Sequence, residues 1–265
     1  MRSLSISLCI FIFLLTDISF AQTLEPLHSF DAAEAHQGIA VDAGYFYPVA
    51  TTSIAKHDKN TGEKVAEWKA GESSGIIHLD SGVIVDGKLY ASHSNYPGIP
   101  MASSVEVWDA ETLEHIESHS FGIRWGSFTW LDRHNDSWWA GFANYDRFLE
   151  STGRNHRWTT IIKLDDDWNA IESWILPGQV LERIKPMSNS GGSWGPDDYL
   201  YLTGHDRAEV YKMSLPESGS ELVLEAIIPI STNGQGIAWD RSNDKNHIYS
   251  IQRKEKKVVV SELKE

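Results

Sequence analysis

Four histidines are the residues of this sequence best suited to chemistry: His36, His78, His93 and His205. Near neutral pH an imidazole can accept or donate a proton, so these residues suit general acid–base catalysis. Three neutral imidazoles can also bind a divalent metal such as zinc and leave one coordination position open. The sequence has no HxH or HExxH spacing and requires no cofactor. Proton transfer is therefore the first expectation, and a bound divalent metal is the second.

Tyr145 adds a further proton donor, so the predicted catalytic residues are His36, His93, Tyr145 and His205. The predicted substrate-binding residues have amide, aromatic, hydroxyl or charged side chains: Gln37, His78, Asp80, Trp125, Asn144, Arg183, Ser190, Gln235 and Arg253. An arginine binds a carboxylate or sulfate in forked geometry. The alternative for the arginines is an ion pair with Asp80, Asp206 or Glu209, and each histidine could instead hydrogen-bond a neighbouring repeat.

A phrase that recurs five times provides the frame that must position these side chains. Its copies are HQGIAVD, DSGVIVD, GSFTWLD, GSWGPD and GQGIAWD, and each ends in an aspartate before a turn and a second apolar run. We call these residues the anchor aspartates: Asp42, Asp86, Asp132, Asp197 and Asp240. A repeat of about 40–50 residues with several strands and no helical period is typical of a β-propeller. The sequence therefore predicts an all-β, five-bladed β-propeller.

The spacing of the anchors predicts how the blades are elaborated. They recur every 43 to 46 residues, except that 65 residues separate Asp132 from Asp197. The long interval contains DRFLESTGRNHR, residues 146–157, which we expect to be a loop inserted in the third blade. No segment has a convincing helical period. We expect the N-terminal segment Glu25–Phe30 to complete the last blade as its outer strand, which closes the ring and removes exposed sheet edges.

The strand order of a propeller blade selects where a binding site can lie. Strands alternate in direction, so the start of the innermost strand and the end of the second open onto the same face, around the channel. The anchor aspartates repeat in every blade and are expected to be structural, because Asp accepts backbone hydrogen bonds in tight turns. The residues at the selected positions differ from blade to blade. Unlike polar side chains that converge on one rim are what a binding site requires.

Composition limits the compartment and the partners. Arg2, the apolar stretch Leu8–Leu15 and the small residues before Gln22 are typical of a secretory signal peptide, so residues 1–21 are predicted to be cleaved and 22–265 to form one propeller domain. Cys9, the only cysteine, lies in that signal, which leaves the exported part without disulfides or thiolate metal sites. A net charge of −14 argues against nucleic acid and anionic membranes as partners. A secreted or periplasmic monomer is expected.

Two segments resemble a known family. HQGIAVDAGYFYPVATTSIAKHDKNTGEKVAEW, from His36 to Trp68, is similar to the opening blade of the plant and bacterial type of glutaminyl cyclotransferase. SSVEVWDAETLEHIESHSF, Ser103 to Phe121, resembles the hairpin of the second blade. The resemblance implies a five-bladed propeller. It lies in blade-building motifs, and the glycine-flanked glutamate of that family has no counterpart in this sequence.

These observations predict an exported propeller enzyme that uses histidine acid–base chemistry on a polar or anionic small molecule or saccharide. Lyase, cyclotransferase and hydrolase reactions all remain open. The alternative is a non-catalytic propeller that binds a glycan or a protein through its rim. The enzyme hypothesis predicts at least one buried rim histidine with a strongly perturbed pKa and a charged neighbour, whereas a binding module needs none.

Overall fold

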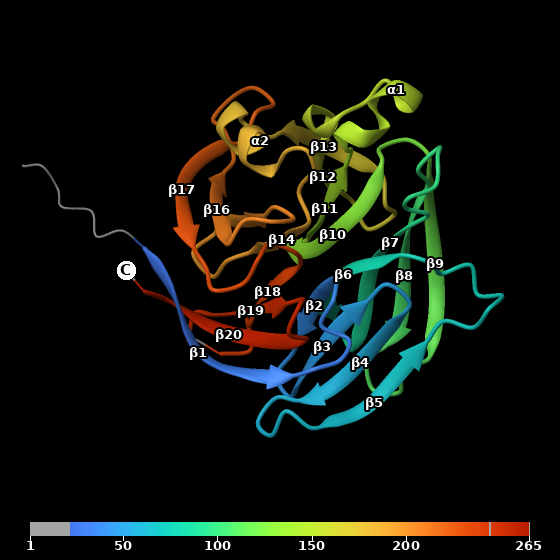
Figure 1. The fold of residues 1–265 in the computed structure, drawn as a ribbon, viewed down its shortest axis with the longest axis vertical. Coiled ribbons are helices and arrows are strands. Elements are labelled where there is room, and N and C mark those ends of the chain that lie inside the picture. Colours follow the sequence, from blue (N-terminus) through green and yellow to red (C-terminus); the bar gives the residue numbers. More distant parts are fainter. Residues whose placement is uncertain (1–21, 244, 265) are drawn as a thin grey trace, which may run out of the picture.

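Five small antiparallel sheets form a ring in the computed structural model, which describes residues 22–243 and 245–264 (Figure 1). The predicted signal peptide at residues 1–21 lies outside the described residues. Each sheet has four strands, and the innermost strand of each lies nearest the axis of the ring. The predicted five-bladed β-propeller is therefore confirmed.

The blades follow one another along the chain. The first is β2 (Gly38–Val41), β3 (Tyr45–Ala50), β4 (Ser53–Asp58) and β5 (Lys64–Lys69). The second is β6 (Leu79–Val85), β7 (Lys88–Ser94), β8 (Ser103–Asp109) and β9 (His115–Gly122). The third is β10 (Ser127–His134), β11 (Ser137–Ala143), β12 (Thr160–Leu164) and β13 (Ala170–Ile175). The fourth is β14 (Gly191–Trp194), β15 (Leu200–Thr203), β16 (Glu209–Ser214) and β17 (Val223–Pro229). The fifth is β18 (Ile237–Trp239), β19 (His247–Gln252), β20 (Lys257–Lys264) and β1 (Thr23–Asp31).

The N-terminal strand closes the ring as the sequence predicts. β1 pairs antiparallel with β20, from Thr23 opposite Lys264 to Asp31 opposite Lys257. Its Phe30 also stacks on Phe46 of the first blade, with ring centroids 4.9 Å apart. The two ends of the described chain are thereby joined in one sheet, and that sheet is joined to the next blade.

Glycines let the inner strands approach one another at the axis. A Cβ on Gly236 would lie 2.5 Å from the Cα of Gly38 and 2.8 Å from the hydroxyl of Ser81. The backbone N–H of Gly236 donates to the carbonyl of Gln37 at 2.9 Å. Blades one, two and five therefore touch through backbone, which narrows the channel beside the start of each inner strand. Gly191 also approaches closely, since its Cβ would lie 2.5 Å from the carbonyl oxygen of Gln235.

The anchor aspartates have the structural role expected of them. Asp42 accepts the backbone N–H groups of Gly44 and Tyr45 at 2.8 and 2.7 Å. Asp132 accepts from the backbone of Trp194 at 2.7 Å and pairs with Arg241. Asp240 is ion-paired with Lys59 at 2.6 Å. These three aspartates satisfy turn backbone or bridge two blades at the end of an inner strand, on the opposite side of the ring from the predicted rim.

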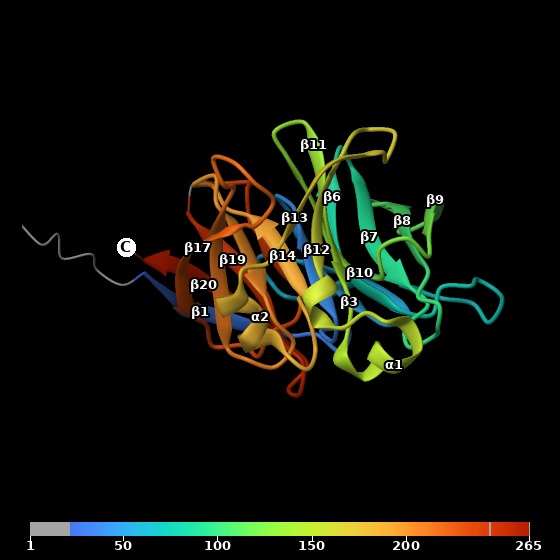
Figure 2. The same cartoon turned by 90° about the horizontal axis from the view of Figure 1, so that it is seen from above.

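Short helices lie at the rim end of the ring (Figure 2). The predicted insertion contains η1 (Asp146–Phe148), α1 (Leu149–Thr152) and η2 (His156–Trp158). The sequence shows no convincing helical period, yet the structure contains α2 (Gly178–Ile184), which packs Val180, Leu181 and Ile184 on the apolar core between blades three and four. Its seven residues make two turns, too few to give a visible helical period. Among the described residues, no helix has the length and apolar character needed to cross a bilayer.

Candidate functional site

Strand pairing brings the starts of the inner strands beside the ends of the second strands, at one mouth of the channel. Ser127 pairs with Ala143 in the third blade, and Gly191 pairs with Thr203 in the fourth. The residues that precede or follow these pairs therefore surround the mouth. The side chains that the structure brings together there are His36, His78, Asp80, Tyr96, Tyr145, His205 and Arg253, which we call the mouth cluster.

Arg253 lies between two histidines of the cluster. Its Nε donates to Nε2 of His36 at 3.1 Å, and its guanidinium nitrogen NH1 is 3.4 Å from Nε2 of His205. Because a guanidinium only donates, an imidazole nitrogen that accepts from it must carry a lone pair. Burial and the nearby charges of Arg253 and Lys256 lower the pKa of His36, which keeps this imidazole neutral. Within the described residues no carboxylate lies within 4.0 Å of Arg253, so the positive charge at the mouth is not neutralised by an ion pair.

Asp80 and His78 form the buried part of the cluster. Asp80 is 7% exposed, and its Oδ2 has no hydrogen-bond partner among the described residues. Its Oδ1 is 3.7 Å from Nε2 of His78, close enough for a proton to pass with small movements but too far for a formed hydrogen bond. Burial raises the pKa of Asp80 well above its usual value, although the charge of Arg253 opposes the rise. Burial, together with His93, Arg253 and His36, lowers the pKa of His78 to about 4.

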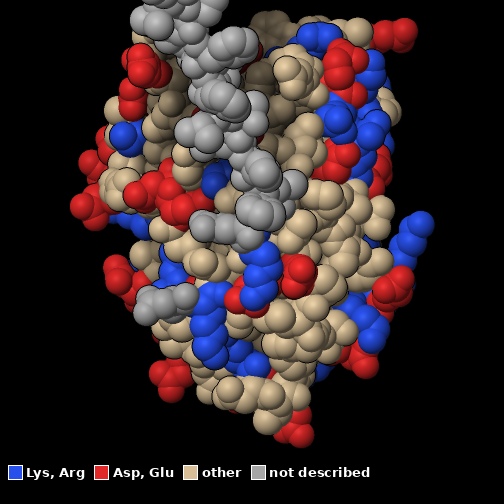
Figure 3. Space-filling model, turned by 90° about the vertical axis from the view of Figure 1, so that its left-hand side faces the viewer, with Lys and Arg blue, Asp and Glu red and all other residues tan. Residues whose placement is uncertain are grey.

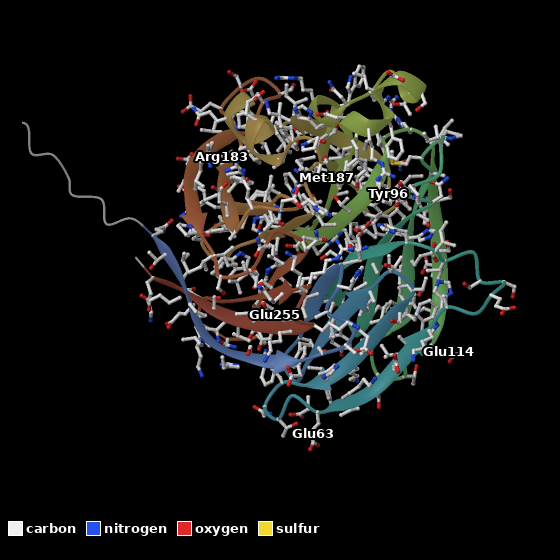
Figure 4. The ribbon with its side chains drawn as sticks, in the orientation of Figure 1. Glu63, Tyr96, Glu114, Arg183, Met187 and Glu255 are labelled. Atoms are coloured by element: carbon white, nitrogen blue, oxygen red, sulfur yellow. The ribbon has the colours of Figure 1, made fainter. Side chains whose placement is uncertain are left out.

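Two tyrosines form the wall beside this pair. The ring of Tyr96 lies 4.9 Å from His78 and 5.1 Å from Tyr145, and the guanidinium of Arg147 is 5.1 Å from the centre of the Tyr96 ring. Burial and the proximity of Asp80 raise the pKa of Tyr145, so its hydroxyl keeps its proton, although a hydrogen bond with Ser127 opposes the rise. Tyr96 and Met187 lie nearer the axis of the ring than Glu63 and Glu114, which mark outer hairpin turns (Figure 4).

Burial favours the uncharged form of both side chains. It raises the pKa of Asp80, which favours the protonated carboxyl, and lowers the pKa of His78, which favours the neutral imidazole. A protonated carboxyl is a proton donor, and a neutral imidazole is a proton acceptor. The mouth therefore has an acid, a base and an unneutralised cation within one cluster.

His93 is among the predicted catalytic residues, but the structure engages both of its ring nitrogens elsewhere. Nε2 accepts the backbone N–H of Ile77 at 3.2 Å, and Nδ1 contacts the hydroxyl of Ser104 at 2.9 Å. Ser104 in turn donates to the buried carboxylate of Glu106 at 2.5 Å. The side chain belongs to this network in the second blade, and not to the group around Arg253.

Other predicted site residues support the loops of the mouth. Gln37 and Gln235 are buried, and their amide nitrogens donate to the hydroxyl of Thr51 at 3.4 Å and the carbonyl of His205 at 3.2 Å. The amide nitrogen of Asn144 donates to the carbonyls of Trp125 and Trp158 at 3.0 and 3.1 Å.

Three more of the predicted residues lie outside the cluster: Trp125, Arg183 and Ser190. The Trp125 ring packs against Phe142 at 4.9 Å, in the apolar core of blades two and three. Arg183 forms the alternative ion pair with Glu209, at 2.8 Å. Arg183 lies at α2, away from Tyr96 (Figure 4). Ser190 donates its backbone N–H to the carbonyl of Thr203 at 3.0 Å.

The described residues provide no ready ligand set for the divalent metal that the sequence left open. No group of three or more His, Cys, Asp or Glu side chains in ranges 22–243 and 245–264 has the arrangement needed to hold a metal ion. His36 and His205 are separated by the guanidinium of Arg253, and Nδ1 of His205 is bound to Asp206 at 2.6 Å.

The contribution of the insertion to the mouth of the channel was not predicted from the sequence. Arg147 lies over Tyr96, and the hydrogen bond between Asp146 and the buried His156, at 2.5 Å, fixes the start of the insertion next to Tyr145. The signal available in the sequence was the long interval between Asp132 and Asp197, because an insertion after a second strand must lie at the mouth.

Comparison with known proteins identifies the fold of the chain but not its family. No family model matches the chain, and no curated protein matches its sequence. The chain has a β-propeller fold. It is similar to the PQQ-bound aldose sugar dehydrogenase of Streptomyces coelicolor, with a TM-score of 0.53 and 10% identity over 92% of this chain and 98% of that chain. It is also similar to a luciferin-regenerating enzyme, with a TM-score of 0.54 and 11% identity over 92% and 96%.

A chain of the mitotic checkpoint complex is similar as well, with a TM-score of 0.51 and 10% identity over 100% of this chain and 99% of that chain. These identities show a shared fold alone, because one fold supports many functions. The comparisons show no similarity to glutaminyl cyclotransferases.

Proposed function

We propose that this protein is an acid–base enzyme that acts on a small anionic molecule at the channel mouth, and that its reaction is an elimination next to a carboxylate. The observation that carries this proposal is the buried carboxyl of Asp80, whose Oδ2 has no partner among the described residues and whose Oδ1 lies 3.7 Å from His78. A buried, incompletely bonded carboxyl is costly to the fold, which favours a functional reason for its presence. Export of the protein and a monomeric state remain predictions from the sequence.

Arg253 is the proposed receptor for the carboxylate of the substrate. Its guanidinium lies between the imidazoles of His36 and His205 and has no carboxylate within 4.0 Å among the described residues, so it offers a positive charge at a partly buried position. A carboxylate bound there becomes a better electron sink, which acidifies the C–H bond on the neighbouring carbon. Among the arginines predicted to bind an anion, Arg183 is already neutralised by Glu209.

In the proposed step, every proton that is released is taken up by the substrate or by the cluster. Neutral His78 takes the proton from the carbon next to the carboxylate, and the C–H electron pair becomes the second bond of a C=C. The bond from the adjacent carbon to its oxygen breaks, and the leaving oxygen takes the proton of Asp80. The proton on His78 then returns to Asp80 across their 3.7 Å separation, which restores both groups. Tyr145 donates a hydrogen bond to the substrate and closes one side of the site.

Asp80→Asn tests this proposal, because Asn is close in shape to a protonated Asp. Wild type and variant are incubated with a panel of uronic acids and β-hydroxy acids, and the conjugated C=C is followed by ultraviolet absorption and mass spectrometry. We expect the wild type to turn over at least one compound and the variant to be slower by about 100-fold or more. Binding of the same compound is retained. Asp136→Asn, in a turn at the opposite end of the ring, is the matched control.

Two results would contradict the proposal. Turnover by Asp80→Asn at the wild-type rate would remove Asp80 from the chemistry. A ligand bound at the mouth and recovered unchanged from the wild type would favour the non-catalytic binding propeller.

A further inference from the structure

The arginines of the protein are concentrated at the mouth end of the ring. Nine of them lie in the described residues, and seven are on loops or short helices at this end: Arg124, Arg147, Arg154, Arg157, Arg183, Arg207 and Arg253. The chain as a whole has a net charge of −14, so this concentration runs against its overall charge. On the side formed by outer strands of blades four and five, both charge signs are intermingled where the surface is visible (Figure 3).

Four of the mouth arginines have no carboxylate within 4.0 Å among the described residues: Arg124, Arg147, Arg154 and Arg253. Arg133 and Arg241, at the opposite end, are each paired with an aspartate. Three of the four unpaired guanidiniums lie over aromatic rings instead, Arg124 over Trp125 at 4.8 Å, Arg147 over Phe148 at 4.6 Å and Arg154 over Trp158 at 5.4 Å. A ring orients a guanidinium without neutralising it, so each still presents its charge to a ligand.

A hollow of about 330 Å³ lies between the insertion and the loop that follows β7. Ile99, Met101 and Ile123 give it an apolar surface, and Asn144, Ser151 and Arg154 give it polar groups. Met101 packs with Tyr145 and Phe148, and Asn144 precedes Tyr145 in the chain. Met101 and Asn144 therefore connect the hollow to Tyr145 of the mouth cluster.

The chemistry of this hollow matches one kind of ligand. A sugar ring has an apolar C–H face and a polar hydroxyl edge, and a uronic acid adds a carboxylate. The C–H face can pack on Ile99, Met101 and Ile123. The hydroxyl edge can hydrogen-bond to Asn144 and Ser151, and the carboxylate can bind Arg154. Arg154 is also held in place, because its guanidinium donates to the carbonyl of Arg124 at 3.0 Å.

We propose that the mouth binds an acidic oligosaccharide, with the reacting uronic acid at Arg253 and a second carboxylated ring in the hollow beside Arg154. The assignment of the reacting end rests on the proposed function, whereas the subsite at Arg154 rests on the hollow and the unpaired arginines. The substrate class is therefore a chain of acidic sugars, longer than the single ring that the mouth cluster contacts.

Calorimetric binding measurements test this inference. The protein is Asp80→Asn, in which turnover is suppressed, and the probes are tetrasaccharides of galacturonate, mannuronate and alternating glucuronate, with maltotetraose as the neutral probe of equal length. At least one acidic tetrasaccharide binds, and maltotetraose binds at least about tenfold more weakly. Adding Arg154→Gln weakens the acidic tetrasaccharide about tenfold, since a charge-assisted hydrogen bond is lost. The matching uronic acid monomer is unaffected by that change.

Arg133→Gln is the matched control, because it removes the same charge from the opposite end of the ring. It changes binding by less than about twofold. The inference is overturned if no acidic tetrasaccharide binds, if maltotetraose binds equally well, or if Arg154→Gln and Arg133→Gln have the same effect. It is also overturned if an acyl or aromatic carboxylate binds more tightly and with the same dependence on Arg154.

The outcomes separate this inference from the proposed function. Binding that depends on Arg154, together with no turnover by the wild type, refutes the enzyme and keeps the oligosaccharide site. Turnover of a uronic acid that depends on Asp80 but not on Arg154 keeps the enzyme and refutes the subsite.

Discussion

His78 and Asp80 have pKa values that burial displaces in opposite directions, and each displacement affects stability. The pKa of His78 is lowered to about 4, so between pH 6.5 and 4 the unfolded chain takes up a proton that the folded chain does not. The contribution of His78 is fully present above pH 6.5 and is lost as the pH falls towards 4. Asp80 acts in the other direction, because the folded chain holds a proton that the unfolded chain loses above pH 3.8.

Replacing His78 with Gln isolates the first effect. We expect the free energy of unfolding of the wild type, relative to His78→Gln, to fall by up to about 3 kcal/mol between pH 7 and 4. Urea unfolding at several pH values measures this difference. A constant difference between the two proteins across that range would show that His78 ionises at its ordinary pKa.

The sequence predicted most of the mouth residues but not their orientation. His36, His205, Tyr145 and Arg253 follow from strand alternation alone. His93 does not, because the pairing of β6 with β7 is irregular between Leu79 and Gly82, where one extra residue is accommodated. Such a bulge changes which side chains face the axis. The protonation states also depend on burial, which is a property of the folded molecule.

At the scale of elements, the inner strands are held together by backbone contact that only glycine permits. Gly236→Ala places a methyl group 2.5 Å from the Cα of Gly38, a backbone atom, and 2.8 Å from the Oγ of Ser81. We expect a loss of about 1–3 kcal/mol or more in the free energy of unfolding, measured by urea denaturation. Gly71→Ala is the matched control, because no atom lies within 4 Å of a Cβ at that position. Equal stabilities of the two variants would contradict the close contact.

The elements differ in how well the sequence predicted them. The strands and hairpins repeat, and Asp58, Asp109 and Asp165 each accept two backbone N–H groups in corresponding turns. The closing strand β1 could be predicted because the last blade lacked an outer strand. The helix α2 occurs once and is too short for a period, so its position depends on the core that it covers.

At the scale of the whole molecule, the distribution of charge matters more than its sum. The chain has a net charge of −14, yet arginines without carboxylate partners gather at one end of the ring. The net charge alone does not predict this positively charged end. These four arginines come from three separate segments, and two of them, Arg147 and Arg154, lie in the single insertion that the sequence marked only as a long interval. Fold and closure follow from local patterns, whereas this surface requires the ring to be assembled.

The central claim is that the carboxyl of Asp80 keeps its proton at the mouth of the channel. The most direct measurement is a pH titration of aspartate carboxyl carbons by NMR, with Asp80→Asn to assign the resonance. The account predicts that Asp80 still holds its proton at pH values where exposed carboxyls have lost theirs, well above 3.8. An Asp80 resonance that titrates with the exposed aspartates would contradict it, and the proposed acid would then be an ordinary carboxylate.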